Sequence, residues 1–181
     1  MINKSTFVAI LTYNEESNIS NCIDSIFYCS FDNICIFDGG STDRTIEIAR
    51  DKKVLIDVIH NSSISERRGL ALKYAIENNF EFVLFVDADQ RLLDSTTAPQ
   101  IEKIFINESS LAGVQLNLVE PQGEIKLNYW QLGFYSRHSL ITTNFGPKAV
   151  IGTPCFFRIN IVKNFQYNIG KILGPSDDTF F

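Results

Sequence analysis

The sequence lacks several features that would each identify a common class of protein. Its four cysteines form no CxxC pair and no zinc-binding spacing, and its two histidines, His60 and His138, are isolated. These absences argue against a His/Cys metal centre and against a Ser-His-Asp triad. No apolar run approaches the roughly 18 to 20 residues needed to span a bilayer, and the apolar segment near the N-terminus is too short for a signal peptide. We therefore expect a cytoplasmic protein without a transmembrane segment, which leaves peripheral association with a membrane open.

Two phosphate-binding motifs and any strongly basic stretch are also missing. No GxGxxG follows the first expected strand, which disfavours a dinucleotide-dependent redox enzyme, and no GxxxxGK[ST] occurs, which excludes a P-loop. The net charge is −5 and no Lys/Arg-rich run is present, so nucleic acid is not an expected partner. With 181 residues, of which 45% are hydrophobic and 20% charged, the chain fits one globular domain with a substantial core.

Strand and helix patterns alternate through the first half of the sequence. Apolar runs predict strands, and apolar residues at helical spacing predict the helices between them. The expected strands are 6–12, 33–38, 54–59 and 82–87, and the expected helices are 19–27, 43–50 and 65–78, the second capped by Ser41, Thr42 or Asp43. This alternation predicts right-handed crossovers and a mostly parallel sheet in an α/β fold.

The second half is predicted to be more antiparallel. A helix is expected after Pro99, at 100–106, and a hairpin is expected from 111–120 and 124–130 around Pro121-Gln122-Gly123. Residues 131–148 are irregular, and the sequence returns to a strand at 148–158. No repeat and no linker interrupts the chain, so we expect a single α/β unit.

Polar clusters follow three of the predicted strands. They are Thr12-Tyr13-Asn14-Glu15, the segment from Asp38 to Asp43, and Asp87-Ala88-Asp89. Ligands of open α/β sheets bind at the carboxyl ends of the strands. The three clusters therefore predict one site, although the Asp38 segment would also serve as a simple turn before a helix and the last cluster as a solvated loop.

The stretch FEFVLFVDADQRL, residues 80–92, places two carboxylates at the end of a buried strand. On an extended backbone Asp87 and Asp89 would point the same way and repel each other. A divalent cation removes this repulsion, and Mg²⁺ or Mn²⁺ typically combines one or two protein carboxylates with phosphate oxygens and water. A nucleoside diphosphate carrying a further group is therefore the expected ligand, with the cation neutralising the diphosphate.

Three motifs in this order resemble the GT-A glycosyltransferases of family 2. They are VAILTYNEESNI, IFDGGSTDRTIEIA and FVLFVDADQRL, and the resemblance covers residues 7–94 well. It continues more weakly over 150–181, where GTPCFFR and GPSDDTFF sit like a later strand and an acidic acceptor-side motif. Each motif is weak alone, but their occurrence in this order is specific.

The resemblance implies a GT-A fold, with a mostly parallel central sheet flanked by helices and a more antiparallel second half. Residues 1–181 would form one domain, with 1–94 binding the nucleotide sugar and 95–181 facing the acceptor. Relatives continue beyond the position of Phe181, so this second half would be truncated at its C-terminus. The implied reaction is an inverting, metal-dependent transfer of a sugar, with a UDP-sugar as donor and a hydroxyl of a saccharide or lipid-linked molecule as acceptor.

The family also implies roles for individual residues. Thr12, Tyr13 and Glu15 would line the nucleoside pocket, Asp38 would accept a hydrogen bond from the base, and Arg67 would approach the nucleotide. A charge on Arg67 that simply faces solvent is an equally open interpretation, because Arg68 is adjacent.

The family's metal and catalytic positions fall on acidic residues here. Asp87 would contact the ribose and the metal, and Asp89 would bind Mn²⁺ or Mg²⁺. In the pair Asp177-Asp178, Asp178 would be the general base that takes the proton of the acceptor hydroxyl, although a helix cap is an alternative role for it.

Some positions depart from the family pattern. Leu11 stands where many relatives have Pro, Asp177 replaces the usual Glu, and Arg68 stands near a common Asn.

Other classes of protein share single features of this sequence. LFVDADQRLLDS resembles the first motif of haloacid-dehalogenase-type phosphatases, in which the equivalents of Asp87 and Asp89 act as nucleophile and acid/base, but YNEE and DGGSTD then have no role. A sugar nucleotidyltransferase would need a Gly-rich signature that is missing. A nucleotide-sugar-binding fragment without catalysis is the remaining alternative.

Overall fold

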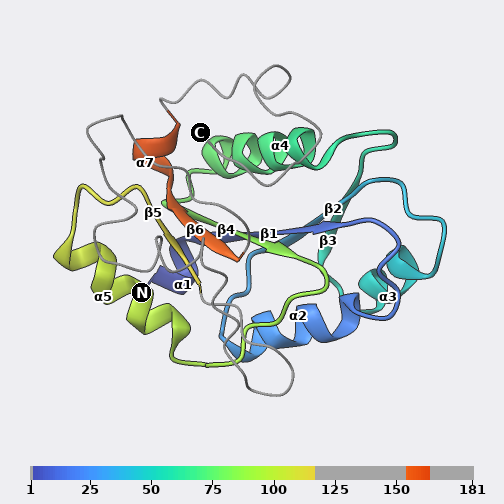
Figure 1. Ribbon diagram of the computed structural model, residues 1–181, viewed down its shortest axis with the longest axis horizontal. Helices are drawn as coiled ribbons and strands as arrows, with labels where there is room; N and C mark the ends of the chain where they lie inside the picture. Colours follow the sequence, from blue (N-terminus) through green and yellow to red (C-terminus); the bar gives the residue numbers. More distant parts are fainter. Residues whose placement is uncertain (1, 117–153, 164–181) are drawn as a thin grey trace, which may run out of the picture.

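The computed structural model describes residues 2–116 and 154–163 (Figure 1). Within these ranges the elements follow one another as α1 (Ile2–Ser5), β1 (Thr6–Thr12), α2 (Ile19–Tyr28), β2 (Ile34–Asp38), α3 (Thr45–Asp51), β3 (Leu55–Val58), α4 (Ile64–Glu77), β4 (Phe82–Asp87), α5 (Thr97–Asn107), β5 (Gly113–Gln115), β6 (Cys155–Arg158) and α7 (Ile159–Val162). The alternation of strands and helices expected for the first half is confirmed. None of the helices in the described part is long and apolar enough to cross a membrane.

The six strands form one sheet in the order β3-β2-β1-β4-β6-β5. β1 pairs in parallel with both β2 and β4, and β2 pairs in parallel with β3. β6 runs antiparallel to both of its neighbours, β4 and β5. The register places Thr12 opposite Asp38 and Leu11 opposite Asp87, so the carboxyl ends of three strands meet at one edge.

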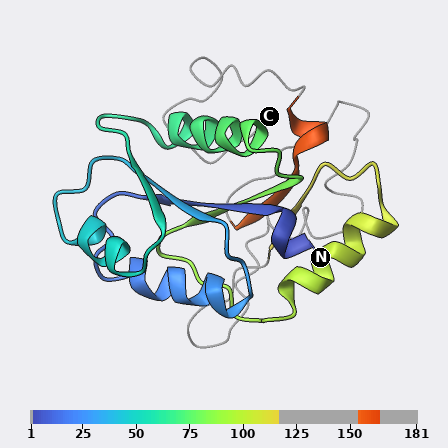
Figure 2. The same ribbon diagram turned by 180° about the vertical axis from the view of Figure 1, so that it is seen from behind.

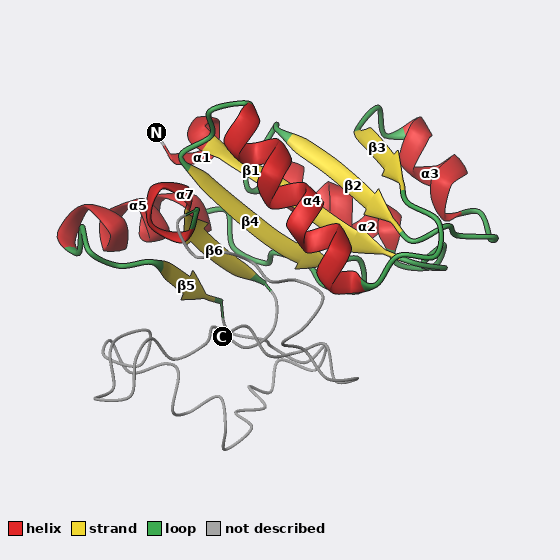
Figure 3. Cartoon of the chain, turned by 90° about the horizontal axis from the view of Figure 1, so that it is seen from above, coloured by secondary structure: helices red, strands yellow, loops and turns green. Residues whose placement is uncertain are grey.

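Helices cover both faces of this sheet. α4 and α7 lie on one face, and α2, α3 and α5 lie on the other, as the opposite views of Figures 1 and 2 show. α4 runs across β4, β1 and β2 (Figure 3). This arrangement buries β1 completely, with Val8 and Ile10 packed toward α2 and with Phe7, Ala9 and Leu11 packed toward α4.

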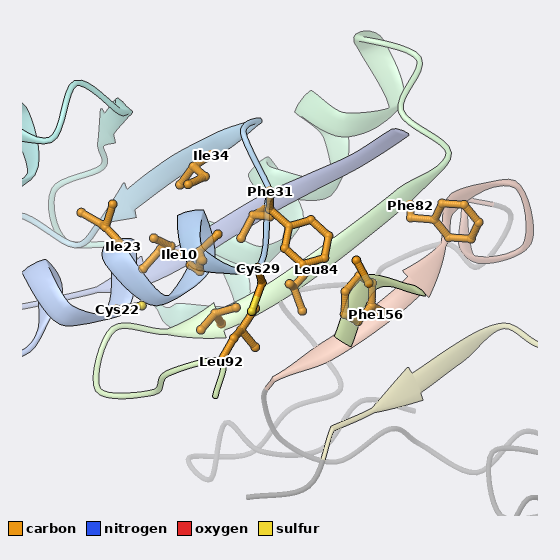
Figure 4. Packing of buried hydrophobic residues seen from close by; sticks show 14 of the residues in the cluster. Ile10, Cys22, Ile23, Cys29, Phe31, Ile34, Phe82, Leu84, Leu92 and Phe156 are labelled. Carbon is orange, nitrogen blue, oxygen red and sulfur yellow. The ribbon is translucent and has the colours of Figure 1, made fainter. Parts of the chain in front are cut away.

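The larger of the two core clusters includes buried residues of α2 and α5. Figure 4 shows some of its side chains between α2 and the sheet. Ile23 of α2, Ile10 of β1, Leu84 of β4 and Phe156 of β6 are all fully buried in it. Burying a side chain of this size contributes about 1.5–3 kcal/mol of free energy. This cluster therefore ties the antiparallel β6 to the parallel half of the sheet.

Two helices begin at residues other than those expected. α3 begins at Thr45 with Arg44 at its N-cap position, so the expectation of Ser41, Thr42 or Asp43 as the cap is wrong. Asp43 lies outside the helix, where its carboxylate accepts a hydrogen bond of 3.0 Å from the Thr45 N–H. α4 begins at Ile64, one residue early, because Ser63 and Glu66 form a capping box: the Ser63 hydroxyl accepts from the Glu66 N–H, and the Glu66 carboxylate accepts from the Ser63 N–H.

The second half departs further from expectation. α5 begins before Pro99, which lies in the first turn, where a missing N–H costs nothing. Only residues 113–115 of the expected hairpin form a strand in the described part, and their partner is β6. Its second strand (124–130), the irregular stretch 131–148 and the expected start of the last strand lie outside the described residues. The short helices α1 and α7 were not expected.

Candidate functional site

The loops that follow β1 and β2 are joined by hydrogen bonds between side chains of one and backbone groups of the other. We call them the β1–α2 loop (residues 13–18) and the β2–α3 loop (residues 39–44). The Asn14 N–H donates to the Ser41 hydroxyl at 2.8 Å, and the Thr42 N–H donates to Asn14 Oδ1 at 2.8 Å. Asn14 has a φ of 55°, a left-handed conformation that asparagine tolerates better than most residues. The two loops therefore behave as one unit.

Acidic residues extend this junction toward α3. The Glu15 N–H donates to Thr45 Oγ1 at 2.7 Å, the Glu16 N–H to Asp43 Oδ2 at 3.1 Å, and the Arg44 N–H to Glu16 Oε2 at 3.0 Å. Desolvation raises the pKa of Asp43, but hydrogen bonds from Thr45 and Glu16 outweigh it, so the net pKa lies below its usual value. Asp43 is therefore a carboxylate that fixes the backbone of both loops.

Asp38, the last residue of β2, is fully buried and directs its carboxylate into the β2–α3 loop. Its Oδ1 accepts hydrogen bonds from the Gly40 N–H at 2.8 Å and the Ser41 N–H at 2.7 Å, and its Oδ2 accepts from the Ser41 hydroxyl. Asp38 therefore shapes the turn, the simpler of its two expected roles. Its contact with a nucleobase stays a prediction.

Gly39 allows two candidate donor-site residues to meet. A Cβ at this position would lie 2.6 Å from Arg67 Nη1 and 3.3 Å from Tyr13 Cδ2. Tyr13 is 55% exposed, whereas Arg67 is buried on α4 and donates from Nη1 to the Ser62 carbonyl at 2.7 Å. The interpretation of Arg67 as a solvated charge is therefore wrong.

Thr12, at the end of β1, is also buried. Its Oγ1 has no hydrogen-bond partner among the residues that the structure describes. Thr12 therefore lies beneath the loops, opposite Asp38 in the register of β1 and β2. Its place in the nucleoside pocket stays a prediction.

Asp87 ends β4, and the chain turns immediately after it. The Gln90 N–H donates to the Asp87 carbonyl at 2.9 Å, and the Asp87 N–H donates to Gln90 Oε1 at 3.1 Å. The expectation that Asp87 and Asp89 lie on one extended strand is therefore wrong, because Asp89 lies within this turn. Asp89 is exposed, and the Asp87 side chain is 31% exposed.

A cation of the protein itself lies beside Asp87. Arg68 Nη2 is 3.7 Å from Asp87 Oδ1, and the Arg68 side chain is only 3% exposed. The sequence offered no signal for this pair, since two adjacent arginines on a helix are usually solvated.

Cys22 of α2 lies beneath the same turn (Figure 4), and its thiol donates to the Asp87 carbonyl at 3.8 Å. Burial raises the pKa of Cys22 to about 12, and the negative charges of Asp89, Asp87 and Glu15 add to the rise. The thiol is therefore neutral near pH 7. The charges of Glu15, after β1, and of Asp87 and Asp89, at the end of β4, all affect this thiol, so the ends of the two strands lie close to each other.

Asp87 and Asp89 suit a divalent cation that arrives with a phosphate ligand. The described ranges contain no group of three or more His, Cys, Asp or Glu side chains that could hold a metal ion by themselves. Mg²⁺ and Mn²⁺ nevertheless bind with one or two protein carboxylates when phosphate oxygens and water complete the shell. The donor set therefore fits such an ion. Asp177 and Asp178 lie outside the described residues.

Comparison with known proteins agrees with this geometry. The family model "Glycosyl transferase family 2" matches residues 7–165. The chain is 35% identical over 119 residues to glycosyltransferase AglJ of Haloferax volcanii, covering 65% of this chain and 38% of that protein. It is 28% identical over 140 residues to UDP-N-acetylglucosamine–dolichyl-phosphate N-acetylglucosaminyltransferase of Methanococcus voltae, covering 67% of this chain and 55% of that protein. The chain thus spans only part of the length of these curated relatives.

A solved structure shares the fold. The mannosyltransferase PcManGT of Pyrobaculum calidifontis, in complex with GDP-Man and Mn²⁺, superposes with a TM-score of 0.66 at 16% identity, covering 90% of this chain and 46% of that one. The sheet order, the joined loops at the strand ends and the match over residues 7–165 lead to one conclusion. The chain belongs to glycosyl transferase family 2 and has the GT-A fold.

Proposed function

We propose that this chain binds a nucleoside-diphosphate sugar and transfers its sugar, with inversion, to a hydroxyl group of an acceptor. The observation that carries the proposal is the meeting of three strand ends at one edge of the sheet. There the joined β1–α2 and β2–α3 loops, the exposed Tyr13 and the partly exposed Asp87 lie together. This edge is where open α/β sheets bind their ligands.

The nucleoside is proposed to lie against the joined loops. The exposed ring of Tyr13 offers a face on which a base can stack. Arg67 lies next to it and adds positive charge for the nucleotide. Thr12 and Asp38 end the two adjacent strands, and Glu15 follows Tyr13 in the β1–α2 loop, so we propose that they line the same pocket. We propose UDP as the nucleotide because the Methanococcus voltae relative is named for a UDP-sugar, although the structural neighbour holds GDP-Man.

The diphosphate is proposed to lie over the turn after β4. Asp87 and Asp89 would hold Mn²⁺ or Mg²⁺ there, and the ion would neutralise the diphosphate as leaving group. The presence of Mn²⁺ with a nucleotide sugar in PcManGT supports this assignment. Asp87 would also contact the ribose, since its side chain is partly exposed and its backbone lies beside the end of β1.

The acceptor is proposed to approach from the side formed by the second half of the chain. Asp178 would take the proton of the acceptor hydroxyl as the sugar carbon leaves the diphosphate. We propose a saccharide or a lipid-linked molecule that offers a hydroxyl. The Methanococcus voltae relative is named for a lipid substrate, dolichyl phosphate, whose attacking atom would instead be a phosphate oxygen.

The alternatives have less support. A haloacid-dehalogenase-type phosphatase would use Asp87 and Asp89 but would give no role to the joined loops. A binding module without catalysis would share the donor site and differ only in turnover.

A thermal-shift panel of nucleotides and nucleotide sugars, with Mn²⁺ and with EDTA, tests the proposal, because a ligand that binds the native state raises the melting temperature. We expect UDP and UDP-sugars to raise it most, and only with the metal. Metal-dependent release of UDP from the responding sugar separates an enzyme from a binding module. Hydrolysis of a simple phosphate ester without any nucleotide response would favour the phosphatase.

A further inference from the structure

Arg68 lies in the middle of α4 with its side chain turned into the protein, toward the end of β4. The side chain is 3% exposed, and its Nη2 atom is 3.7 Å from Asp87 Oδ1. A guanidinium that loses its water needs compensating charge, and the partly exposed Asp87 carboxylate supplies negative charge beside it. At 3.7 Å the attraction is electrostatic, beyond the usual range of a hydrogen bond.

The carboxylate of Asp87 has an inner and an outer edge. Its Oδ1, which faces Arg68, is buried, although the side chain as a whole is 31% exposed. The exposed surface therefore belongs to atoms of the side chain other than Oδ1. One carboxylate oxygen therefore lies beside a fixed cation, in a side chain that is still partly exposed at the edge of the sheet.

The backbone of Asp87 is already fixed without Arg68. Gln90 bonds to both its N–H and its carbonyl, and the Ala88 N–H donates to the Leu11 carbonyl at 3.1 Å. The direction of the carboxylate is set by its side-chain contacts, and Arg68, at 3.7 Å, is one of them.

The pair lies where electrostatic attraction is strong. Cys155 of β6 is fully buried, and the charges of both Arg68 and Asp87 act on its thiol, in opposite directions. Charges surrounded by such apolar packing attract each other more strongly than charges in water.

We propose that Arg68 is a positioning residue for the donor: it holds the inner edge of Asp87 so that the outer edge faces the ribose and the metal. It also supplies a positive charge that offsets the repulsion between Asp87 and Asp89 before any metal binds. This role rests on the proposed function, because it concerns how the same donor site is organised.

A double-mutant cycle on UDP affinity, measured by calorimetry with Mn²⁺, tests this role. The variants are Arg68→Gln, Asp87→Asn and the two combined. We expect each single variant to weaken UDP binding by roughly tenfold, the size of coupling between charged groups in contact. The double variant should bind no more weakly than Asp87→Asn alone, because Arg68 acts through Asp87. Losses that simply add would overturn the proposal.

Two further variants keep the result interpretable. Arg158→Gln removes another partly buried arginine, which donates to the carbonyls of Phe105 and Leu111 at the opposite end of β4 and should leave UDP affinity unchanged. An equal loss of affinity in Arg158→Gln would mean that general destabilisation explains the effect, and it would overturn the role of Arg68.

If Arg68→Gln does not fold, Arg68→Lys replaces it. This variant keeps the charge and should lose less affinity than Asp87→Asn, with no further loss when the two are combined. Absence of UDP binding in the unaltered chain would overturn the proposed donor together with this role. UDP binding that is unaffected by Arg68→Gln or Arg68→Lys would overturn the role of Arg68 alone.

Discussion

Asn14 Oδ1 accepts a hydrogen bond of 2.8 Å from the backbone N–H of Thr42, so a side chain after β1 satisfies the backbone after β2. Ser41 returns the interaction by accepting from the Asn14 N–H. The polar motifs YNEE and DGGSTD therefore serve the structure as well as any ligand. Their side chains fix the shape of the edge to which a nucleotide would bind.

Asn14→Gly should lower the free energy of unfolding by about 1 kcal/mol, because glycine adopts the same φ but the hydrogen bond to Thr42 is lost. Urea unfolding measures the change. Asn79→Gly is the matched control, since Asn79 also has a left-handed conformation, with a φ of 58°, but lies after α4. Equal stability of Asn14→Gly and the unaltered chain would show that this hydrogen bond contributes nothing.

Asp38→Ala should reduce both stability and UDP affinity, each by about 1–3 kcal/mol, because it leaves the partly buried N–H groups of Gly40 and Ser41 without their acceptor. Ser41→Ala is the control for stability, since it removes only the hydroxyl from the same group of hydrogen bonds. A folded Asp38→Ala chain with undiminished UDP affinity would limit Asp38 to its role in the turn.

Asp89→Ala should abolish the part of UDP binding that depends on Mn²⁺ while leaving the fold intact, because Asp89 is exposed in the turn after β4. Calorimetry with Mn²⁺ and with EDTA measures the difference. Asp57→Ala removes an exposed carboxylate on β3 and should leave the metal response unchanged. Equal UDP affinity with Mn²⁺ and with EDTA in the unaltered chain would exclude a metal role for both Asp87 and Asp89.

The buried thiols predict a loss of stability at high pH. Burial raises the pKa of both Cys22 and Cys155 from 9.0 to about 12. The folded state therefore holds these protons more tightly than the unfolded state. The stabilisation is complete below pH 9 and is lost as the pH rises toward 12, by up to about 1.4 kcal/mol per thiol per pH unit.

The variant Cys22→Ala/Cys155→Ala tests this pH dependence. Its free energy of unfolding, measured by urea unfolding between pH 8 and pH 10.5, should fall less steeply above pH 9 than that of the unaltered chain. Parallel curves for the two proteins would show that the thiols do not cause the loss.

Asp178→Asn should reduce turnover by about 10²–10⁴-fold with little change in UDP affinity, because it removes a general base and not a donor contact. Asparagine caps a helix as well as aspartate does, so this variant keeps a cap and removes only the base. If Asp178 were only a helix cap, turnover would stay near normal. Steady-state kinetics with a true acceptor measure the effect, and Asp177→Asn is the adjacent control. Near-normal turnover in Asp178→Asn would move the role of base to another residue.

The sequence predicted the strands well, because β1, β2 and β4 are buried on both faces and so consist almost entirely of apolar residues. It also placed the polar clusters at the strand ends. The earlier start of α4 could also have been predicted, since Ser63 and Glu66 have the spacing of a capping box.

Two features of the site could not be predicted from the local sequence pattern. The turn at Asp87-Ala88-Asp89 includes a hydrogen bond from the Asp87 N–H to the Gln90 side-chain oxygen, whereas strand alternation predicted an extended segment. The ion pair between Arg68 and Asp87 joins α4 to the end of β4, two elements that are separate in the sequence. Contacts between distant segments leave no periodic signal in the sequence, so neither could be inferred from spacing.

The position of β6 has a consequence for synthesis on the ribosome. β1 to β4 emerge first and can pair in parallel, but β6 emerges much later and must then enter beside β4, with β5 adding at its far side. Until then the free edge of β4 exposes backbone groups that can pair with another chain. Closing so long a loop is slow compared with local pairing. The nascent protein is therefore most prone to aggregation in the interval between completion of β4 and arrival of Cys155–Arg158.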